Sequence, residues 1–245
     1  MEKNVTVITC SPIPQKAGST DAAPPQQSTD DKFLSLLQNK ISYPLDMEDN
    51  RMLKRSFDIV FSLVVIMFFL SWLIPLLAIL IKITSGGPVI FRQQRTGMNN
   101  RAFVCWKLRT MRTNREAHSR QASEGDPRIT FIGRFLRKFS LDEIPQFFNV
   151  LLGNMSIVGP RPHMIRHTEQ YSMVIDKYML RHFVKPGITG LSQVAGYRGE
   201  IRNEAMLRNR VKLDVFYMEK WNFMLDLRII LRTVKLMLFG DRNAY

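Results

Sequence analysis

Cysteine is scarce in this sequence, which has only Cys10 and Cys105 among 245 residues. One lies in a polar stretch and the other in an apolar one, so they do not form a disulfide framework and a reducing cytosolic setting is expected. The first 30 residues lack the apolar core after a basic start that marks a secretory signal. We find no internal repeat.

Acidic residues are also few. There are 21 Asp and Glu against 35 Lys and Arg, which gives a formal net charge of +14. Such an excess implies anionic partners: nucleic acid, acidic lipid headgroups or phosphorylated substrates. Composition alone does not choose among them. With 45% hydrophobic residues, the chain has enough apolar material for one sizeable core, so we expect one main domain with appendages.

The N-terminal part shows no hydrophobic periodicity. Residues 1–30 are rich in Pro, Gln, Ser, Thr and Asp, which is typical of a disordered tail. Phe33, Leu37 and Ile41 then recur at helical spacing and indicate a short amphipathic helix. We therefore assign residues 1–50 to a disordered tail that contains this possible helix.

A long apolar run follows the tail. From Ile59 to Ile81 the sequence has 23 residues without a charged side chain, long enough to cross about 30 Å of hydrocarbon at about 1.5 Å per residue. Basic residues lie on both sides of the run, and basic flanks prefer the cytoplasmic side of a membrane. These flanking residues include Arg51, Lys54 and Arg55 before the run and Lys82, Arg92 and Arg95 after it.

A bend at Pro75 would allow both basic flanks to stay on the same side of the membrane. Proline has no amide hydrogen, so it deprives the carbonyl of Ser71, four residues earlier, of its helical partner and bends the helix. A bent helix that enters and leaves through one leaflet keeps both flanks on one side. We predict a re-entrant membrane helix over residues 51–84 with its hinge at Ser71 and Pro75. The alternative is a kinked helix that spans the membrane.

The remainder of the chain mixes short strands with helices. Residues 89–91 and 103–111 favour strands, and period-two alternation places Lys107 and Arg109 on one face. Residues 131–139 favour a short basic helix. Residues 211–239 alternate apolar positions with Lys and Arg, which is typical of helices that lie on an anionic membrane. Amphipathic helices packed on the core would show the same pattern.

Two adjacent acids, Asp142 and Glu143, precede an apolar run. Ser140 and Glu143 match a capping box, which would give the acids a purely structural role. However, a helix capped by Ser140 would place Pro145 where it deletes an internal hydrogen bond. A helix capped by Asp142 would not. The second alternative places the Asp142 carboxylate at a positive helix end and favours its ionised form.

An ionised carboxylate can attack phosphorus, and a neighbouring carboxylate can hold a divalent cation. Further on, Arg161 stands between two prolines and is suited to bidentate contact with phosphate. His163 and His167 are four residues apart, but no third ligand accompanies them. We expect a surface or phosphate-contact role for these histidines rather than zinc binding.

Six segments of the sequence, taken together, resemble one family. They are "KRSFD", "FRQQRTG", "WKLRTM", "DPRITFIGRFLRKFSLDEIPQFFNVLLGNMSIVGPRP", "VKPGITGLSQ" and "LDVFYMEKW". They resemble the bacterial sugar transferase family, the monotopic polyprenyl-phosphate phosphoglycosyl transferases, over about residues 51 to 245. The resemblance implies an α+β fold, mainly α. It further implies a monotopic membrane protein with a proline-broken re-entrant helix, amphipathic interfacial helices and a small cytoplasmic catalytic domain with short β segments over residues 85–245.

The resemblance also implies residue roles. Asp142 would be the catalytic nucleophile and Glu143 a catalytic residue that binds Mg²⁺. The residues implied in substrate binding are Lys107, Arg109, Arg137, Arg161 and Asp214.

The implied reaction transfers a hexose-1-phosphate from a UDP-sugar to undecaprenyl phosphate through a phosphosugar on Asp142, with release of UMP. This reaction would be the first membrane step of exopolysaccharide, capsule or glycan assembly. It would take place at the cytoplasmic face of the bacterial inner membrane, in contact with membrane lipids. Downstream glycosyltransferases and a second copy of the chain are possible partners, and no nucleic acid is expected.

The donor sugar is less clearly indicated. "GYRGE" and "DRNAY" favour a glucose-type donor over a galactose-type donor. Many relatives have Trp, Ala and Asn where this chain has Leu191, Ser192 and Ala195, so the donor stays open. The competing class of function is a non-enzymatic, membrane-anchored basic module that binds acidic lipid or nucleic acid. That class gives no reason for the ordered run from Arg137 to Arg161.

Overall fold

The computed structural model describes residues 42–113, 122–123, 125–199, 201 and 203–239. The chain is mostly helical with short strands, which confirms the predicted α+β class, mainly α. Most of the predicted N-terminal tail, including its possible helix, and the terminal "DRNAY" lie outside the described residues.

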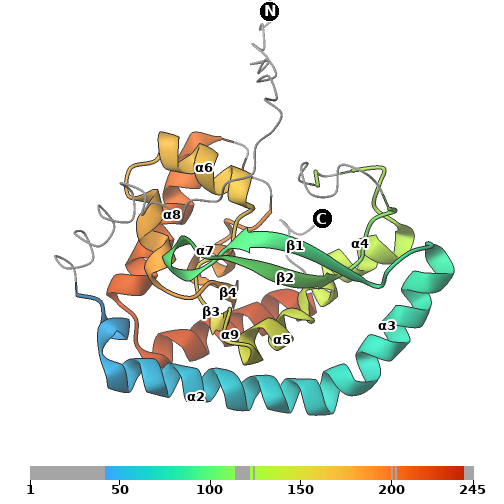
Figure 1. Cartoon of the computed structure of the whole chain (residues 1–245), viewed down its shortest axis with the longest axis horizontal. Helices are drawn as coiled ribbons and strands as arrows, with labels where there is room; N and C mark the ends of the chain where they lie inside the picture. Colours follow the sequence, from blue (N-terminus) through green and yellow to red (C-terminus); the bar gives the residue numbers. More distant parts are fainter. Residues whose placement is uncertain (1–41, 114–121, 124, 200, 202, 240–245) are drawn as a thin grey trace, which may run out of the picture.

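The apolar run lies in the longest helix. This helix has 37 residues, and among the described residues it is the one helix long and apolar enough to cross a membrane. It consists of α2 (Glu48–Val65), a π-helical segment η2 (Ile66–Leu70) and α3 (Ser71–Thr84). Figure 1 shows that α3 turns away from the line of α2, so the predicted bend is present.

The irregular turn lies just before the predicted hinge. At the end of η2 the Ser71 amide donates to the carbonyl of Ile66, five residues earlier, so this turn is wider than an α-helical one. The Ser71 hydroxyl donates to the Met67 carbonyl at 2.7 Å and adds a further bond in the same turn. Wide turns bend helices, and Pro75 removes one more amide donor in the next turn. Together these features account for the bend.

A β-hairpin follows the long helix. Strands β1 (Ile90–Thr96) and β2 (Ala102–Leu108) pair antiparallel, with Phe91 opposite Lys107. Strands were predicted at residues 89–91 and 103–111, but their pairing was not predicted. β1 continues past the predicted segment to Thr96, and β2 ends at Leu108. β1 extends this far because its polar residues pair with β2 along the whole strand, up to Thr96 opposite Ala102.

A second, parallel sheet was not predicted. It pairs β3 (Ser156–Val158) with β4 (Gly187–Thr189). Each strand has three residues, too few for alternation to be visible in the sequence. Parallel strands need a crossover between them, and here the crossover contains α6 (Ile165–Val174) and η5 (Tyr178–Phe183).

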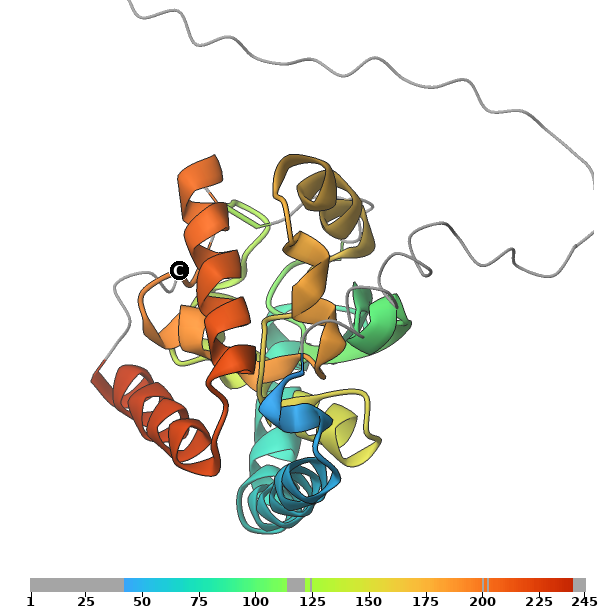
Figure 2. The same ribbon diagram turned by 90° about the vertical axis from the view of Figure 1, so that its left-hand side faces the viewer.

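Further helices, short and long, complete the globular part. Residues 131–139, predicted to be helical, form α4 within one residue of that range. The remaining helical elements are η1 (Pro44–Asp46), η3 (Met98–Asn100), α4 (Phe131–Lys138), η4 (Leu141–Glu143), α5 (Gln146–Leu151), α7 (Leu191–Val194), α8 (Glu204–Glu219) and α9 (Phe223–Phe239). In Figure 2, α2 is seen end-on at the bottom with α9, in red, beside it.

Polar contacts attach α2 to the globular part. Lys54 lies 2.6 Å from Asp226 of α9, and both side chains are buried. Arg55 donates to two carbonyls at the end of α5. Asp58 accepts a hydrogen bond from the Ile157 amide at the centre of β3. The charged residues of "KRSFD" therefore join the first half of the long helix to three later elements.

Apolar contacts attach α3 to the same globular part. Leu77 and Ile81 are buried, one turn apart, and belong to one apolar cluster with Leu108 of β2 and Leu136 of α4. The opposite face of α3 is exposed and carries Trp72, Leu76, Ile79, Leu80 and Ile83.

The two C-terminal helices differ in how much apolar surface they bury. In α8, Leu207, Val211 and Met218 are buried in the core, so packing on the core describes this helix. In α9, Asp226 and Ile229 are buried, but Leu231 and Leu238 stay exposed and recur at helical spacing. Contact of this exposed stripe with a membrane stays a prediction.

Candidate active site

Asp142 and Glu143 lie in η4, between α4 and α5. Neither of the two predicted caps forms: η4 and α5 have no side-chain cap, and α5 begins at Gln146, directly after Pro145. The capping-box and the Asp142-cap interpretations were therefore both wrong. Ser140 adopts a left-handed conformation (φ 59°), and its hydroxyl accepts a hydrogen bond from Arg198 at 2.5 Å.

Glu143 is held by two cations. Lys107 Nζ and Arg161 Nη2 both lie 2.6 Å from its Oε1, and Arg161 Nη1 donates to Oε2 at 3.1 Å. Although burial raises the pKa of Glu143, attraction to Arg161 and Lys107 outweighs it and holds the pKa well below its ordinary value. Glu143 is therefore a buried, permanently ionised carboxylate at neutral pH.

Asp142 is in a different electrostatic state. Burial and the neighbouring Glu143 carboxylate raise its pKa above the ordinary 3.8, against the lowering effect of Lys107, Arg137 and Arg198. The predicted preference for the ionised form is thus opposed by desolvation. Lys107, Arg137 and Arg198 lower the pKa of Asp142 and so offset part of this effect.

Arg137 is placed by its helix and by a close backbone contact. Its Nε donates to the Thr110 hydroxyl at 2.8 Å. A Cβ at Gly133, one turn earlier in α4, would overlap the Thr110 carbonyl, so glycine lets α4 approach the end of the hairpin. This bond uses the Nε edge of the Arg137 guanidinium and leaves the two Nη atoms available to an anion.

Arg161 follows β3. The Gly159 amide donates to the Thr189 carbonyl, and the Gly187 amide donates to the Pro160 carbonyl, each at 2.9 Å. These bonds extend the parallel ladder beyond β3 and lead the chain to Arg161. The predicted residues Lys107, Arg137, Asp142, Glu143 and Arg161 therefore come together in space.

Two other predicted residues lie elsewhere. Arg109 donates through Nη2 to the Ser85 carbonyl at 2.7 Å, just beyond the end of α3. Asp214 of α8 is 1% exposed; its Oδ1 accepts from Ser192, and its Oδ2 lies 2.7 Å from Arg181. The structure does not bring either residue into direct contact with Glu143.

Arg198 and His163 add to what the sequence indicated. Arg198 was missed as a site residue because the sequence shows only its glycine-rich surroundings, whereas the structure folds it onto Ser140. The surface role expected for His163 was wrong, because this side chain is buried. Burial and Arg181 hold its pKa well below the ordinary value.

The acid pair is compatible with a magnesium ion. Among the described residues no group of three or more His, Cys, Asp or Glu side chains is placed to hold a metal. Mg²⁺, however, commonly uses one or two carboxylates together with substrate phosphates. A carboxylate offers about four acceptor positions. The three contacts of Glu143 leave one position on Oε2.

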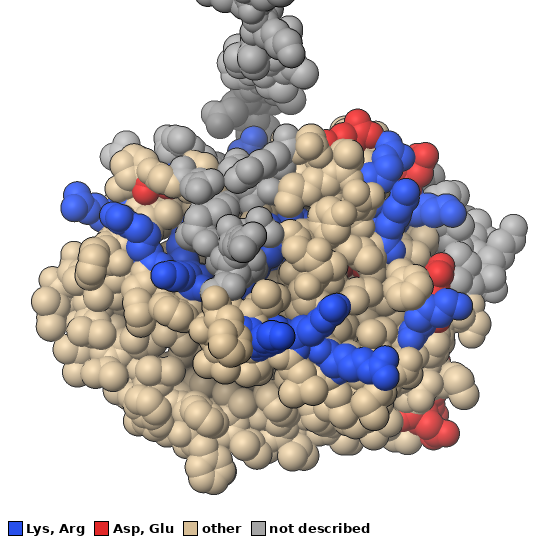
Figure 3. All heavy atoms as spheres, turned by 180° about the vertical axis from the view of Figure 1, so that it is seen from behind, with Lys and Arg blue, Asp and Glu red and all other residues tan. Residues whose placement is uncertain are grey.

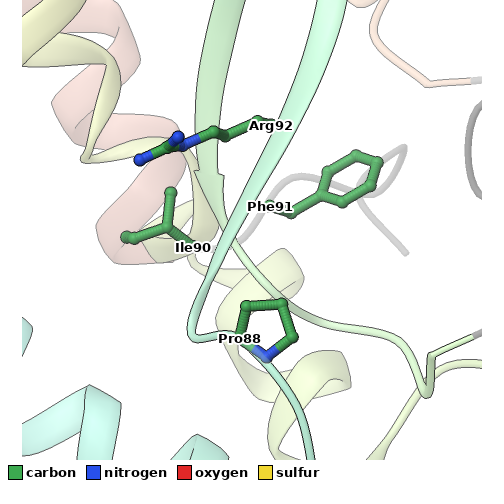
Figure 4. Close-up of a pocket in the computed structure, with 4 residues that line it drawn as sticks. All are labelled: Pro88, Ile90, Phe91 and Arg92. Carbon is green, nitrogen blue, oxygen red and sulfur yellow. The ribbon is translucent and has the colours of Figure 1, made fainter.

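The surface shows two further features. A hollow of about 420 Å³ at the base of the hairpin is lined by Pro88, Ile90, Phe91 and Arg92; in Figure 4, Ile90 and Arg92 point to one side of β1 and Phe91 to the other. None of these residues belongs to the cationic cluster around the acids. Figure 3 shows that Lys and Arg gather in a band across the back of the molecule, above a lower part that is free of them.

Comparison with known proteins places this arrangement in a family. The model of the family described as "Bacterial sugar transferase" matches residues 49–240. A UDP-glucose:undecaprenyl-phosphate glucose-1-phosphate transferase of Escherichia coli is 47% identical over 76% of this chain and 40% of its own length. A protein of the same name from Caulobacter vibrioides is 44% identical over 78% of the chain and 72% of its own length. An undecaprenyl-phosphate galactose phosphotransferase of Salmonella typhimurium is 37% identical over 90% of the chain and 48% of its own length.

Glucose-type names thus accompany the higher of these identities. The chain spans about 40% of the length of the E. coli relative. The family match covers most of the chain and includes the acid pair and its cations. The chain belongs to the bacterial sugar transferase family.

Proposed function

We propose that this protein transfers a hexose-1-phosphate from a UDP-sugar to undecaprenyl phosphate, as the first membrane step of exopolysaccharide, capsule or glycan assembly. The observation that carries the proposal is the buried Asp142–Glu143 pair with four surrounding cationic side chains. Burying two carboxylates is costly unless nearby cations compensate their charge. A diphosphate substrate would take its place among these cations.

The two acids have separate roles in this proposal. Asp142 attacks the sugar-linked phosphorus of the donor, the bond from that phosphorus to the bridging oxygen breaks, and UMP leaves. An oxygen of undecaprenyl phosphate then attacks the same phosphorus and breaks its bond to Asp142. The product is a polyprenyl diphosphate sugar, and the carboxylate is regenerated.

The cations would stabilise the charge that develops in both steps. Lys107, Arg137 and Arg198 lower the pKa of Asp142 and so favour the nucleophilic form. Arg161 would add the charge of a guanidinium whose two Nη atoms bond to Glu143 in this structure. Glu143 would hold Mg²⁺ through its remaining acceptor position. A bound Mg²⁺ would supply charge neutralisation at the phosphate oxygens.

The donor and the partners follow from the relatives. We favour a glucose-type donor, since the glucose-1-phosphate transferases are more similar to this chain than the galactose phosphotransferase. The predicted second copy of the chain and the downstream glycosyltransferases stay predictions, as does the absence of a nucleic-acid partner.

Membrane attachment would be re-entrant, with the active site on the cytoplasmic face of the inner membrane. Support comes from the two halves of the long helix, since α2 contacts α9 and β3, while α3 packs on β2 and α4. A helix that crossed the bilayer from end to end would separate these contacts by the thickness of the membrane.

The proposal is tested by measuring UMP release. The purified protein, undecaprenyl phosphate and Mg²⁺ are incubated with a panel of UDP-sugars, and UDP-glucose should give the fastest release. A second assay omits undecaprenyl phosphate and follows exchange of labelled UMP into the UDP-sugar. Exchange is expected, because the first step is reversible and precedes acceptor binding.

A chain that releases no UMP with any donor, while still binding acidic vesicles, would support the non-enzymatic lipid-binding alternative. UMP release without exchange would argue against the covalent intermediate and for direct transfer.

A further inference from the structure

The backbone around Arg161 is fixed by buried groups outside the acid cluster. Arg181 Nη2 donates to the Arg161 carbonyl at 2.8 Å, and Arg95 Nη1 donates to the Pro162 carbonyl at 2.9 Å. The next carbonyl, that of His163, accepts from the Thr96 amide at 3.0 Å. Three successive carbonyls are therefore held, which restricts the backbone from which the Arg161 side chain extends.

Arg181 is itself held from several sides. It is 1% exposed, lies 2.7 Å from Asp214 and contacts His163 Nδ1 at 2.9 Å. Asp214 is held in turn by the Ser192 hydroxyl at 2.8 Å. The Tyr178 ring lies beside the guanidinium, 5.4 Å from ring centroid to Cζ. Arg181 therefore has little freedom to move away from the Arg161 carbonyl.

Stability alone does not account for a pair of this kind. Taking two charges fully out of water costs several kcal/mol for each ion, and well-packed apolar residues often serve stability equally well. What an arginine adds is a directed donor that an apolar side chain lacks. Here that donor meets the backbone of a residue that bridges both oxygens of Glu143.

We propose that Arg181 and Asp214 are positioning residues, which set the Arg161 guanidinium on Glu143 without touching substrate. Asp214 orients Arg181, Arg181 fixes the Arg161 carbonyl, and Arg161 holds the carboxylate. This gives Asp214 an indirect role in place of the substrate contact that family resemblance implied. Only the kinetic part of the test below rests on the proposed transferase activity.

The first experiment compares Asp214→Asn with Asp226→Asn. Both aspartates are 1% exposed and each lies opposite a buried cation, Arg181 or Lys54. Both variants should lose thermal stability, since each leaves a buried charge uncompensated. Only Asp214→Asn should lower kcat, by about 100-fold, because a small misplacement of a catalytic group has that effect. Equal kcat values in the two variants would overturn the proposal.

A double-mutant cycle then tests whether the effect passes through Arg161. Arg181→Lys keeps the charge but loses the planar donor, and Arg161→Lys removes the fork that holds Glu143. If Arg181 acts through Arg161, Arg181→Lys should lower kcat in the wild-type background and have little further effect in the Arg161→Lys background. Fully additive losses would refute this route.

A readout independent of turnover is the environment of the Arg161 guanidinium. Its side-chain Nε–H signal is followed by NMR in protein with ¹⁵N-labelled Arg and is assigned by its loss in Arg161→Lys. Arg181→Lys should shift this signal, because the Arg161 carbonyl loses its donor and the guanidinium moves from Glu143, whereas Asp226→Asn should leave it unchanged. An unchanged signal in Arg181→Lys would contradict the proposal. A shifted signal in protein that releases no UMP would refute the transferase activity alone.

Discussion

At the scale of single residues, the two adjacent acids experience opposite pKa shifts. Two salt-bridging cations lower the pKa of Glu143, while burial and the Glu143 charge raise that of Asp142. Paired acids with pKa values moved apart are a common way to divide roles at an active site. Glu143 is suited to hold positive charge, and Asp142 is suited to react once a phosphate enters.

The first prediction concerns replacement of these acids. Asp142→Asn should lower turnover below about one thousandth of the wild-type rate and abolish the phosphosugar adduct, because the amide is not nucleophilic. Glu143→Gln should lower the rate and weaken its dependence on magnesium. Radiolabelled UDP-sugar and gel analysis detect the adduct.

Thermal unfolding serves as the control for Asp142→Asn. Since burial disfavours the charged form of Asp142, a neutral amide should keep or slightly raise the melting temperature. An adduct that persists in Asp142→Asn would remove this residue from the mechanism.

A second prediction concerns pH. The nucleophile must be ionised, so kcat/KM should fall on the acid side around an apparent pKa above the ordinary 3.8 of Asp. Lys107→Met removes a cation that lowers this pKa and should shift the acid limb to higher pH. Initial rates of UMP release between about pH 4 and 8 measure the shift. An acid limb at the same pH in Lys107→Met and wild type would show that Lys107 does not lower the pKa of Asp142.

Stability should respond to the same two groups with opposite signs. The pKa of Glu143 is depressed in the folded state, so its stabilising contribution is present above its ordinary 4.5 and is lost as pH falls through the folded value. The pKa of Asp142 is raised, so its ionisation lowers stability as pH rises from 3.8 through its folded value.

Much of the site was predictable from the sequence because its residues occur in ordered segments. The family resemblance implied one site for Lys107, Arg137, Asp142, Glu143 and Arg161, and these residues lie close together; their roles stay predictions. Arg198 was not recognised, since it reaches Ser140 across 58 residues. Local spacing carries no information about such a contact.

At the scale of secondary structure, the sequence predicted those elements that are long or that show a clear hydrophobic period. The long apolar helix, the two strands β1 and β2 and the basic helix α4 were predicted because each shows an apolar run or a regular alternation in the sequence. The pairing of β1 with β2 was not predicted. The parallel pair β3 and β4 was missed because three-residue strands show no pattern. The acid turn η4 was misread as a helix start, since helical spacing and a 3₁₀ turn followed by a helix look alike in sequence.

The third prediction concerns the contact between α4 and the hairpin. Gly133→Ala should place a Cβ on the Thr110 carbonyl and push α4, with Arg137, away from Asp142. The free energy of unfolding should fall by about 1–3 kcal/mol, as is typical of overpacking, and kcat should fall as well. Thermal melting and UMP release measure the two effects.

Gly86→Ala is the matched control, because a Cβ at Gly86 meets nothing within 4 Å. It should preserve both stability and rate. A Gly133→Ala variant with wild-type melting temperature and kcat would show that α4 adapts without moving Arg137.

At the scale of the whole molecule, the bent helix of α2 and α3 runs along one side of the globular part, at the bottom of Figure 1. The exposed apolar side chains of α3 lie on one face, and the lower part of the molecule in Figure 3 is free of Lys and Arg. An exposed apolar face on α3, together with a band of Lys and Arg above a part of the surface without them, would suit a protein held in one leaflet with its cations near the lipid phosphates.

The fourth prediction concerns this seating. Single cysteines at Asn50 and Thr84, in a Cys10→Ser, Cys105→Ser background, should both be shielded from a membrane-impermeant thiol reagent in intact cells. Both should react after lysis, because a re-entrant helix keeps both ends inside. Pro75→Ala should straighten the helix, move some molecules to a spanning state and lower activity. Labelling of either position in intact cells would show that the helix spans.

The attachment of α2 also has a consequence for the order of events during synthesis. Lys54 and Asp226 are 172 residues apart, so at about 5–20 residues per second the ribosome needs about 10–30 s to supply the partner. For most of that interval the apolar helix is already complete, while Lys54 has no counter-charge. If the helix attaches to the membrane as proposed, insertion into lipid would come first, and the helix would dock on the globular part only after α9 is made. A nascent chain that stalls before α9 would be anchored to the membrane but left with its helix undocked.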